Sequence, residues 1–284
     1  IIPIRGWRQR NKKVIKVEYK YSKSTLQIDP SKNWGDIISF LILKYFSKSN
    51  KLSPKDIFAF DEEGVQVFKN GKILAIGSSM VFTQPNDIVW GTGCISPEEI
   101  GLPPLKVYLV RGPLTRKELI NKGIETPEIY GDPALLFPEI YNPKPNPKYK
   151  YGLIPHYIDF TDLKSLEVIT RLESQGVKII NITAGVFNFI DELLQCSNIL
   201  SSSLHGLIAS DAYNIPNTRV KLSDKLAGGD FKFNDYSLSM GKTSTIGDIN
   251  DYLHLDYSYN TQWDKNKILE SGPWNDPKCK FFYE

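Results

Sequence analysis

Short runs of β-forming residues alternate with helix-forming runs along the chain, and this alternation restricts the fold more than any other feature of the sequence. In the first half, strand-like runs lie at 14–21, 73–76, 88–90 and 107–110, and helical runs lie at 36–46 and 115–121. Such a rhythm predicts a mostly parallel sheet covered by helices. The helix that begins at Asp36 is apolar on nearly all sides, so we expect it to be buried against that sheet.

A proline-rich run at residues 138–150 divides the chain. Its four prolines remove backbone donors and stiffen the chain toward an extended form, which indicates an interdomain linker. The alternation then restarts, with strand-like runs at 151–154, 177–182 and 199–202 and helical runs at 162–174, 187–195 and 204–215. The 284 residues suffice for two domains. We therefore predict an α/β protein with two Rossmann-like domains, residues 1–140 and 141–284, that face one another across a cleft.

The composition excludes several classes of function. A formal charge of +3 is too small to favour nucleic acid or an anionic membrane as a partner. The three cysteines are not in metal-like pairs, so we predict no metal site and a reducing, cytoplasmic location. No apolar run approaches the roughly 18 residues of a membrane span, and the first residues lack a signal-peptide pattern. The chain does not begin with Met, so a lost targeting segment stays open.

The most informative stretch is residues 198–216, because it places a histidine where a strand becomes a helix. Three serines at 201–203 precede apolar residues at helical spacing, so His205 falls in the first helical turn. There the unpaired backbone N–H groups and the positive end of the helix dipole favour a phosphate or carboxylate. A plain serine cap beside a packed histidine is the alternative. The candidate residues of this junction are His205, Ser201, Ser202, Ser203 and Gly206.

Polar residues also fall near the carboxyl ends of predicted strands in the first half, where ligands of open α/β sheets usually bind. Gly35 would let a ligand approach the backbone, whereas Asn33 and Asp36 would otherwise simply cap the helix that they open. Ser78 belongs to a glycine-rich strand end that matches neither a P-loop nor a dinucleotide fingerprint.

Two further candidates fall at the ends of strand-like runs. Arg111 comes after 107–110, where its guanidinium would grip an oxyanion in a bidentate manner, with a surface pair to a carboxylate as the alternative. His156 ends the first strand of the second half, and a structural role is about as expected for it as a binding role. Asp132 more often closes a turn than performs acid–base chemistry.

Five motifs in the same order resemble the polysaccharide pyruvyltransferase family, in particular the branch that acts on bacterial exopolysaccharides. They are Asn33-Trp34-Gly35-Asp36, Val110-Arg111-Gly112-Pro113-Leu114-Thr115, Gly131-Asp132-Pro133, Ile154-Pro155-His156-Tyr157 and Ser201-Ser202-Ser203-Leu204-His205-Gly206. The resemblance implies a two-lobed fold like that of GT-B glycosyltransferases, with the first lobe on the acceptor side and the second on the donor side. It implies transfer of the enolpyruvyl group of phosphoenolpyruvate onto two hydroxyls of a glycan sugar to form a ketal, with release of phosphate and no further cofactor.

The resemblance also assigns residues. His205 and Arg111 match the family histidine and arginine implicated in donor binding and catalysis. As a mechanistic hypothesis apart from the resemblance, His205 is the general acid and Asp36 is a base for the acceptor hydroxyl, with helix capping as the alternative role of Asp36. Other branches carry an arginine where this chain has Ser203, so Lys221, Lys225 or Lys232 would replace that anion contact. A lipid-linked acceptor, with peripheral membrane association of the protein, stays open. The alternatives are a nucleotide-sugar-dependent GT-B glycosyltransferase and a non-catalytic glycan-binding homologue.

Overall fold

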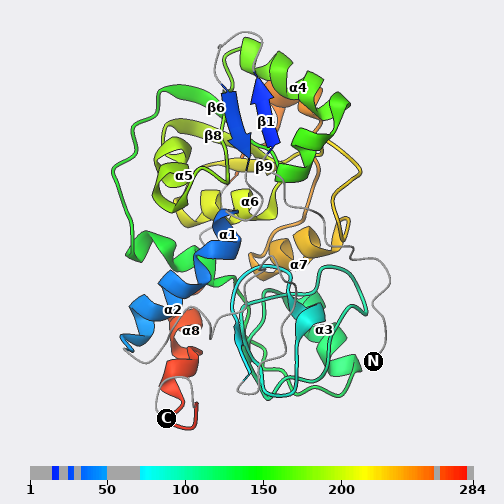
Figure 1. Ribbon diagram of the computed structural model, residues 1–284, viewed down its shortest axis with the longest axis vertical. Helices are drawn as coiled ribbons and strands as arrows, with labels where there is room; N and C mark the ends of the chain where they lie inside the picture. The colour runs from blue at the N-terminus through cyan, green and yellow to red at the C-terminus, as the bar shows by residue number, and fades with distance from the viewer. Residues whose placement is uncertain (1–14, 19–24, 29–32, 50–70, 259–262, 280–284) are drawn as a thin grey trace.

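The computed structural model describes residues 15–18, 25–28, 33–49, 71–258 and 263–279 (Figure 1). Its first parallel sheet has the order β3-β4-β5, formed by β3 (Ile73–Leu74), β4 (Ile88–Trp90) and β5 (Lys106–Leu109). The segments that follow these strands are η3 (Met80–Phe82), α3 (Pro113–Asn121) and η4 (Pro133–Glu139). The sheet is short, and its strands are apolar and buried except at Lys106, which is exposed, and Tyr108, which is half-buried.

The second sheet is also parallel and has the order β7-β6-β8-β9. Its strands are β6 (Tyr149–Ile154), β7 (Lys178–Ile179), β8 (Cys196–Ser201) and β9 (Asn217–Arg219). The helices of this half are η5 (Tyr157–Thr161), α4 (Leu163–Ser174), α5 (Val186–Leu193), α6 (Leu204–Ala212), α7 (Phe231–Ser239) and η6 (Ile249–His254). Two parallel sheets with helices confirm the predicted α/β class.

The strand-like run at 14–21 does not join the parallel sheet, so that expectation was wrong. It forms β1 (Ile15–Glu18), which pairs antiparallel with β2 (Thr25–Ile28) and contacts η5 in the second half. The connection between β1 and β2 is too short for the crossover that parallel pairing requires. In Figure 1, β1 lies at the end of the molecule that holds α4, whereas residues 73–109 lie toward the other end.

The expected long helix is two helices, α1 (Trp34–Ile37) and α2 (Ser39–Ser47), interrupted at Ile38. Trp34, Ile38 and Ile42 are fully buried, whereas Tyr45 is exposed, so the helix pair has one buried face rather than apolar packing on all sides. The Trp34 N–H donates to the carbonyl of Ile182 at 3.1 Å, and α1 contacts α5. The opening helix therefore packs against the second half as well as the first sheet.

The proline-rich run has regular structure at both of its ends, contrary to the prediction. Pro138 lies inside η4, because the fixed φ of proline is close to that of a 3₁₀-helix. Tyr149 begins β6, since the last proline of the run, Pro147, precedes it by two residues.

One cluster of buried apolar residues runs through both halves, with Trp90 and Leu109 from the first and Ile154 and Phe189 from the second. The end of the chain, with α8 (Lys265–Glu270) and η7 (Pro273–Asn275), returns to the first sheet. There Trp274 packs edge-on against Trp90, with 4.9 Å between ring centroids. These contacts join the end of the chain to the first sheet, and the predicted division at residue 140 stays a prediction. None of the helices in the described residues is long and apolar enough to cross a membrane.

Candidate functional site

The strand-to-helix junction at His205 is built as the sequence predicts. β8 ends at Ser201, Ser203 is the extended N-cap residue, and His205 is the second residue of α6. No acceptor in the described residues takes the first-turn N–H groups of α6 at 204–206. The junction therefore presents unpaired donors and the positive end of a nine-residue helix.

The ring of His205 is held by the opening of α1. Nδ1 of His205 lies 3.1 Å from the side-chain oxygen of Asn33, and the imidazole is only 9% exposed. A Cβ at Gly35 would lie 2.3 Å from the ring. Asn33 thus contacts the histidine and makes no side-chain cap bond, and Gly35 leaves room for the imidazole. Substrate binding by Asn33 and Gly35 stays a prediction.

The contact with Asn33 fixes the tautomer of His205. Because the partner atom is a carbonyl oxygen, Nδ1 carries the proton and Nε2 is left as an acceptor. Burial, followed by the positive charges of Lys232 and Arg111, lowers the pKa of His205 to about 3. Burial is the main cause of this shift. The imidazole is therefore neutral at physiological pH.

Arg111 is fully buried behind this site, and protein groups engage its guanidinium. Its Nε donates to Asp235 at 3.0 Å. Nη1 donates to Ser78 Oγ at 2.6 Å and to the Gly77 carbonyl. Nη2 donates to the Cys94 carbonyl and pairs with Asp235 at 3.0 Å. Arg111 therefore pairs with a carboxylate, as the alternative prediction expected, but the pair with Asp235 is buried rather than on the surface. A direct grip on a ligand stays a prediction.

Asp235 links Arg111 to two helices. It belongs to α7 and also accepts hydrogen bonds from the backbone N–H and the hydroxyl of Thr115 on α3, at 2.9 and 2.7 Å. Asp235 could not be found from local patterns, because it lies 124 residues from Arg111 and belongs to no motif. The pair therefore fixes α7, and with it Lys232, against the first half.

Lys232 is the unusual cation of the site. It is 8% exposed, and its ammonium makes no hydrogen bond or ion pair with any described residue. Burial, and after it the charge of Arg111, lowers its pKa to about 8, whereas Asp36 opposes this shift. Lys221 and Lys225, the other predicted replacements for the missing arginine, are exposed and paired with Asp224 and Asp162.

Gly77 marks the point where the two halves meet at the site. A Cβ on Gly77 would lie 3.9 Å from Nε2 of His205 and 3.6 Å from Oδ1 of Asp36. Asp36 is half-buried on α1, and Ser78, also half-buried, follows Gly77 in the chain. The structure thus brings His205, Asp36, Ser78, Arg111 and Lys232 together.

Two residues predicted to bind substrate have structural contacts within the junction, and their substrate binding stays a prediction. Ser201 is fully buried and donates to the carbonyls of Ile154 and Ser203. A Cβ at Gly206 would lie 2.3 Å from Ser201 Oγ and 2.9 Å from Ile154, so this glycine allows α6 to pack closely on the sheet. Ser203 makes no side-chain cap bond, and its hydroxyl is without a partner in the described residues.

Three other predicted residues belong to a separate group around Asp159. His156 is the N-cap of η5, where its Nδ1 accepts from the N–H of Ile158 at 3.2 Å, so the structural role applies. Ser202 donates to Asp159 at 2.6 Å, and Lys221 lies in the same neighbourhood.

The chain matches the family described as polysaccharide pyruvyl transferase over residues 68–221, just over half of its length. The match contains Ser78, Arg111 and His205, whereas Asn33, Asp36 and Lys232 lie outside it. A curated relative, "Uncharacterized protein L143" of Acanthamoeba polyphaga mimivirus, is 33% identical over 168 residues, which cover 57% of each chain. The chain thus matches little more than half of the length of that relative, and no solved structure matches it.

Neither match distinguishes the branches of the family. Because the family model matches more than half of the chain, and the matched region contains both His205 and Arg111, the chain belongs to the polysaccharide pyruvyl transferase family.

Proposed function

We propose that the protein transfers the enolpyruvyl group of phosphoenolpyruvate onto two hydroxyls of a glycan sugar, which forms a pyruvate ketal and releases phosphate. The single observation that carries this proposal is Lys232, an 8% exposed residue whose ammonium makes no hydrogen bond or ion pair with any described residue, lies 5.5 Å from the Phe233 ring centroid, and acts by its charge on the neutral imidazole of His205. A largely buried ammonium without an ion pair is costly, so it indicates that a ligand supplies negative charge in addition to that of Asp36.

The donor fits the groups that surround it. Phosphoenolpyruvate carries a phosphate and a carboxylate, and the site offers Lys232, the first-turn N–H groups of α6 and the hydroxyl of Ser203. Ser78 accepts from Arg111, so its own proton is left for an oxygen of the ligand. We call His205, Lys232, Arg111, Ser78 and Asp36 the donor site.

The residues support a balanced reaction. Donor binding brings negative charge to His205, which raises its pKa so that it takes up a proton. His205 gives this proton to the methylene carbon of the donor, and a sugar hydroxyl adds to the resulting oxocarbenium-like C2 while Asp36 takes its proton. The bond from C2 to the phosphate oxygen then breaks, the second hydroxyl closes the ketal, and its proton leaves with the phosphate. The proton on Asp36 returns to His205.

The context of the reaction is also part of the proposal. The resemblance supports two GT-B-like lobes and a glycan of an exopolysaccharide, capsule or lipopolysaccharide as the acceptor. We place the enzyme in the cytoplasm, at the inner face of the membrane where the acceptor is lipid-linked.

The first experiment measures phosphate release from phosphoenolpyruvate with a panel of α- and β-hexosides, together with mass spectrometry of the products. We expect release that depends on the acceptor, and a product that carries the ketal. Stabilisation by uridine diphosphate and not by phosphoenolpyruvate would instead select a nucleotide-sugar transferase. Donor binding without turnover on any acceptor would favour the glycan-binding homologue.

The second experiment compares Lys232→Met with Lys221→Met by calorimetric titration of phosphoenolpyruvate. Loss of a charged contact of about 1.5–3 kcal/mol weakens donor binding by about 10- to 100-fold in the first variant, and Lys221→Met should bind as the wild type does. Lys232→Met should also melt at a higher temperature, because a largely buried charge without an ion pair in the described residues is removed. Equal donor affinity in the two variants would refute the donor site.

The third experiment tests His205→Gln. Turnover should fall by about 100-fold or more, the usual effect of losing a general acid. Calorimetry in buffers of different ionisation enthalpy should show proton uptake on donor binding in the wild type and none in the variant. Normal turnover with an unchanged pH profile would remove His205 from the mechanism.

A further inference from the structure

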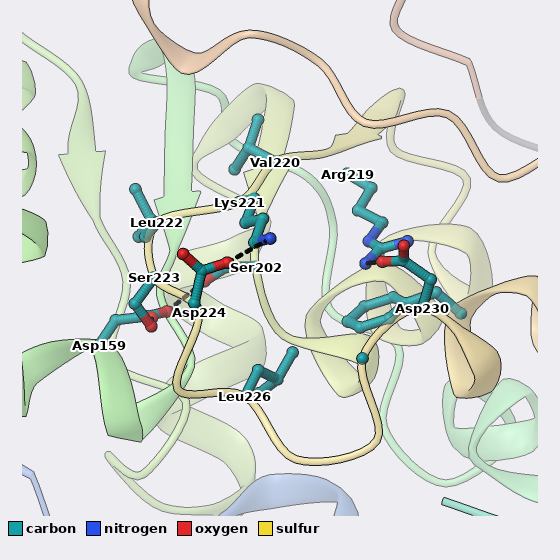
Figure 2. Close-up of a pocket in the computed structure, with 12 residues that line it drawn as sticks. Asp159, Ser202, Arg219, Val220, Lys221, Leu222, Ser223, Asp224, Leu226 and Asp230 are labelled. Atoms are coloured by element: carbon teal, nitrogen blue, oxygen red, sulfur yellow. Dashed lines mark hydrogen bonds and ion pairs between the residues drawn. The ribbon is translucent and has the colours of Figure 1, made fainter. Parts of the chain in front are cut away.

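A small cavity of about 180 Å³ lies at the carboxyl ends of β8 and β9 (Figure 2). Its walls are the segment 219–224 that follows β9, together with Asp159, Ser202, Leu226 and Phe233. Pockets for drug-sized ligands have volumes of about 300–1,000 Å³, so a cavity of this smaller size fits one ring and not an oligosaccharide. We call it the Asp159 cavity.

Asp159 is the buried acceptor of this cavity. Its carboxylate receives hydrogen bonds from Ser202 at 2.6 Å, from Ser223 at 2.7 Å and from the His156 N–H at 3.1 Å. Burial raises its pKa, and the hydroxyl donors oppose this shift. The side chain is therefore held in one orientation by serine hydroxyls, beside an open volume.

The charges around the cavity do not favour an anion. Arg219 pairs with Asp230 and stacks on Phe233, with 3.7 Å from its guanidinium carbon to the ring centroid. Lys221 pairs with Asp224 at 2.5 Å, and Figure 2 shows both ion pairs. With Asp159 the lining has three carboxylates against two cations. Such a lining repels a phosphate, whereas paired carboxylates and hydroxyls are suited to accept hydrogen bonds from a polyol.

The cavity adjoins the donor site along the chain and through space. Ser202 lies three residues before His205, and Phe233 directly follows Lys232. The charge of Arg219 also contributes to the lowered pKa of Lys232. A ring in the cavity would therefore lie beside the donor.

We infer that the Asp159 cavity binds one neutral hexopyranose ring of the acceptor glycan. This inference rests on the proposed function, since it names the subsite of the sugar that receives the pyruvyl group. It also places acceptor binding on the second half, in contrast to the first-half acceptor side implied by the family resemblance. Asp159 and the serine hydroxyls take the hydroxyls of the ring, and the exposed Asp224 lies at the mouth.

The test fills the cavity with Leu226→Trp and compares it with Leu253→Trp, an equal change at an exposed position of η6. Binding of methyl hexopyranosides is measured by saturation-transfer NMR without donor, and acceptor KM and donor KM are measured in turnover. A pocket that loses the fit for its ligand weakens binding by about tenfold or more. We expect that loss in sugar binding and in acceptor KM for Leu226→Trp, with donor KM unchanged, and wild-type values for Leu253→Trp.

A second variant, Asp224→Ala, keeps the inference testable if the larger residue disturbs folding, because Asp224 is exposed. It should raise acceptor KM and leave donor KM unchanged. Unchanged sugar binding in both variants, or an equal loss of donor affinity, would overturn the inference. If the wild type binds the sugar but does not turn over phosphoenolpyruvate, and Leu226→Trp abolishes sugar binding, then the proposed function fails and the assignment of the cavity stands. If the wild type turns over normally and Leu226→Trp leaves acceptor KM unchanged, then the proposed function stands and the assignment of the cavity fails.

Discussion

The donor site and the Asp159 cavity are neighbours along the chain, yet they handle charge in opposite ways. In the donor site Lys232 is largely buried, its ammonium makes no ion pair with any described residue, and the neutral His205 adds no negative charge to that of Asp36. In the Asp159 cavity each cation has its own carboxylate. Burying a charge without an ion pair costs free energy, so the donor site is suited to bind an anion, whereas the Asp159 cavity is suited to bind a neutral ligand.

The largest expected effect concerns the one carboxylate that pairs with the buried arginine of the donor site. Asp235→Ala leaves Arg111 buried without a counter-charge, and breaking such a pair costs about 3–5 kcal/mol in the free energy of unfolding. Urea denaturation measures this loss. Glu139→Ala, which breaks the exposed pair with Lys265, is the control, and we expect at most about 1 kcal/mol there. Equal losses of unfolding free energy in the two variants would mean that the buried pair between Arg111 and Asp235 stabilises the fold no more than an exposed pair does.

A second effect depends on pH and concerns Asp132. This carboxylate is fully buried, one of its oxygens has no hydrogen-bond partner in the described residues, and burial raises its pKa to about 7. The folded protein therefore holds a proton between pH 4 and 7 that the unfolded chain has lost, and stability contributed by Asp132 falls as the pH rises through that window.

Asp132→Asn removes this titration. Relative to the wild type, the variant should gain stability as the pH rises from 4 to 7, by up to about 4 kcal/mol. Urea denaturation at a series of pH values checks the gain. A difference between the two proteins that does not vary with pH would show that Asp132 stays ionised.

A smaller effect tests how the imidazole is seated. Gly35→Ala places a Cβ 2.3 Å from the His205 ring and must push it away from Asn33. We expect about 1–3 kcal/mol of destabilisation from overpacking, and turnover reduced by at least tenfold (about 1.4 kcal/mol) because the reacting nitrogen is displaced. Steady-state kinetics beside denaturation separate the two effects. Gly123→Ala, where a Cβ meets nothing within 4 Å, is the control for added bulk, although its φ of +73° gives a strain of its own.

The smallest effect sharpens the choice among the lysines. Lys225 is exposed and paired with Asp162, so Lys225→Ala should change donor affinity by less than about twofold, in line with the small energies of surface pairs. Calorimetric titration beside Lys232→Met measures the difference. A large loss in Lys225→Ala would move the donor site toward the start of α4.

Local patterns carried most of what was predicted correctly. The strand, serine run and helix around His205 follow from neighbouring residues, and α3, α4 and α5 also appear near their predicted positions. The break at Ile38 and the antiparallel partner of β1 were missed, because both depend on which surface the segment packs against. The roles of Asn33 and Gly35 were assigned to capping and ligand approach for the same reason, since the ring that they contact lies 172 residues away from Asn33.

By itself the sequence determined the α/β class, the position of His205 at a helix N-terminus and the family motifs, because each depends on residues close in the chain. Only the tertiary structure decided that Asp235 neutralises Arg111 and that Lys232, rather than Lys221 or Lys225, is the buried cation. The physical reason is that the energy of a charge depends on its burial and on its partners, and distant segments supply both.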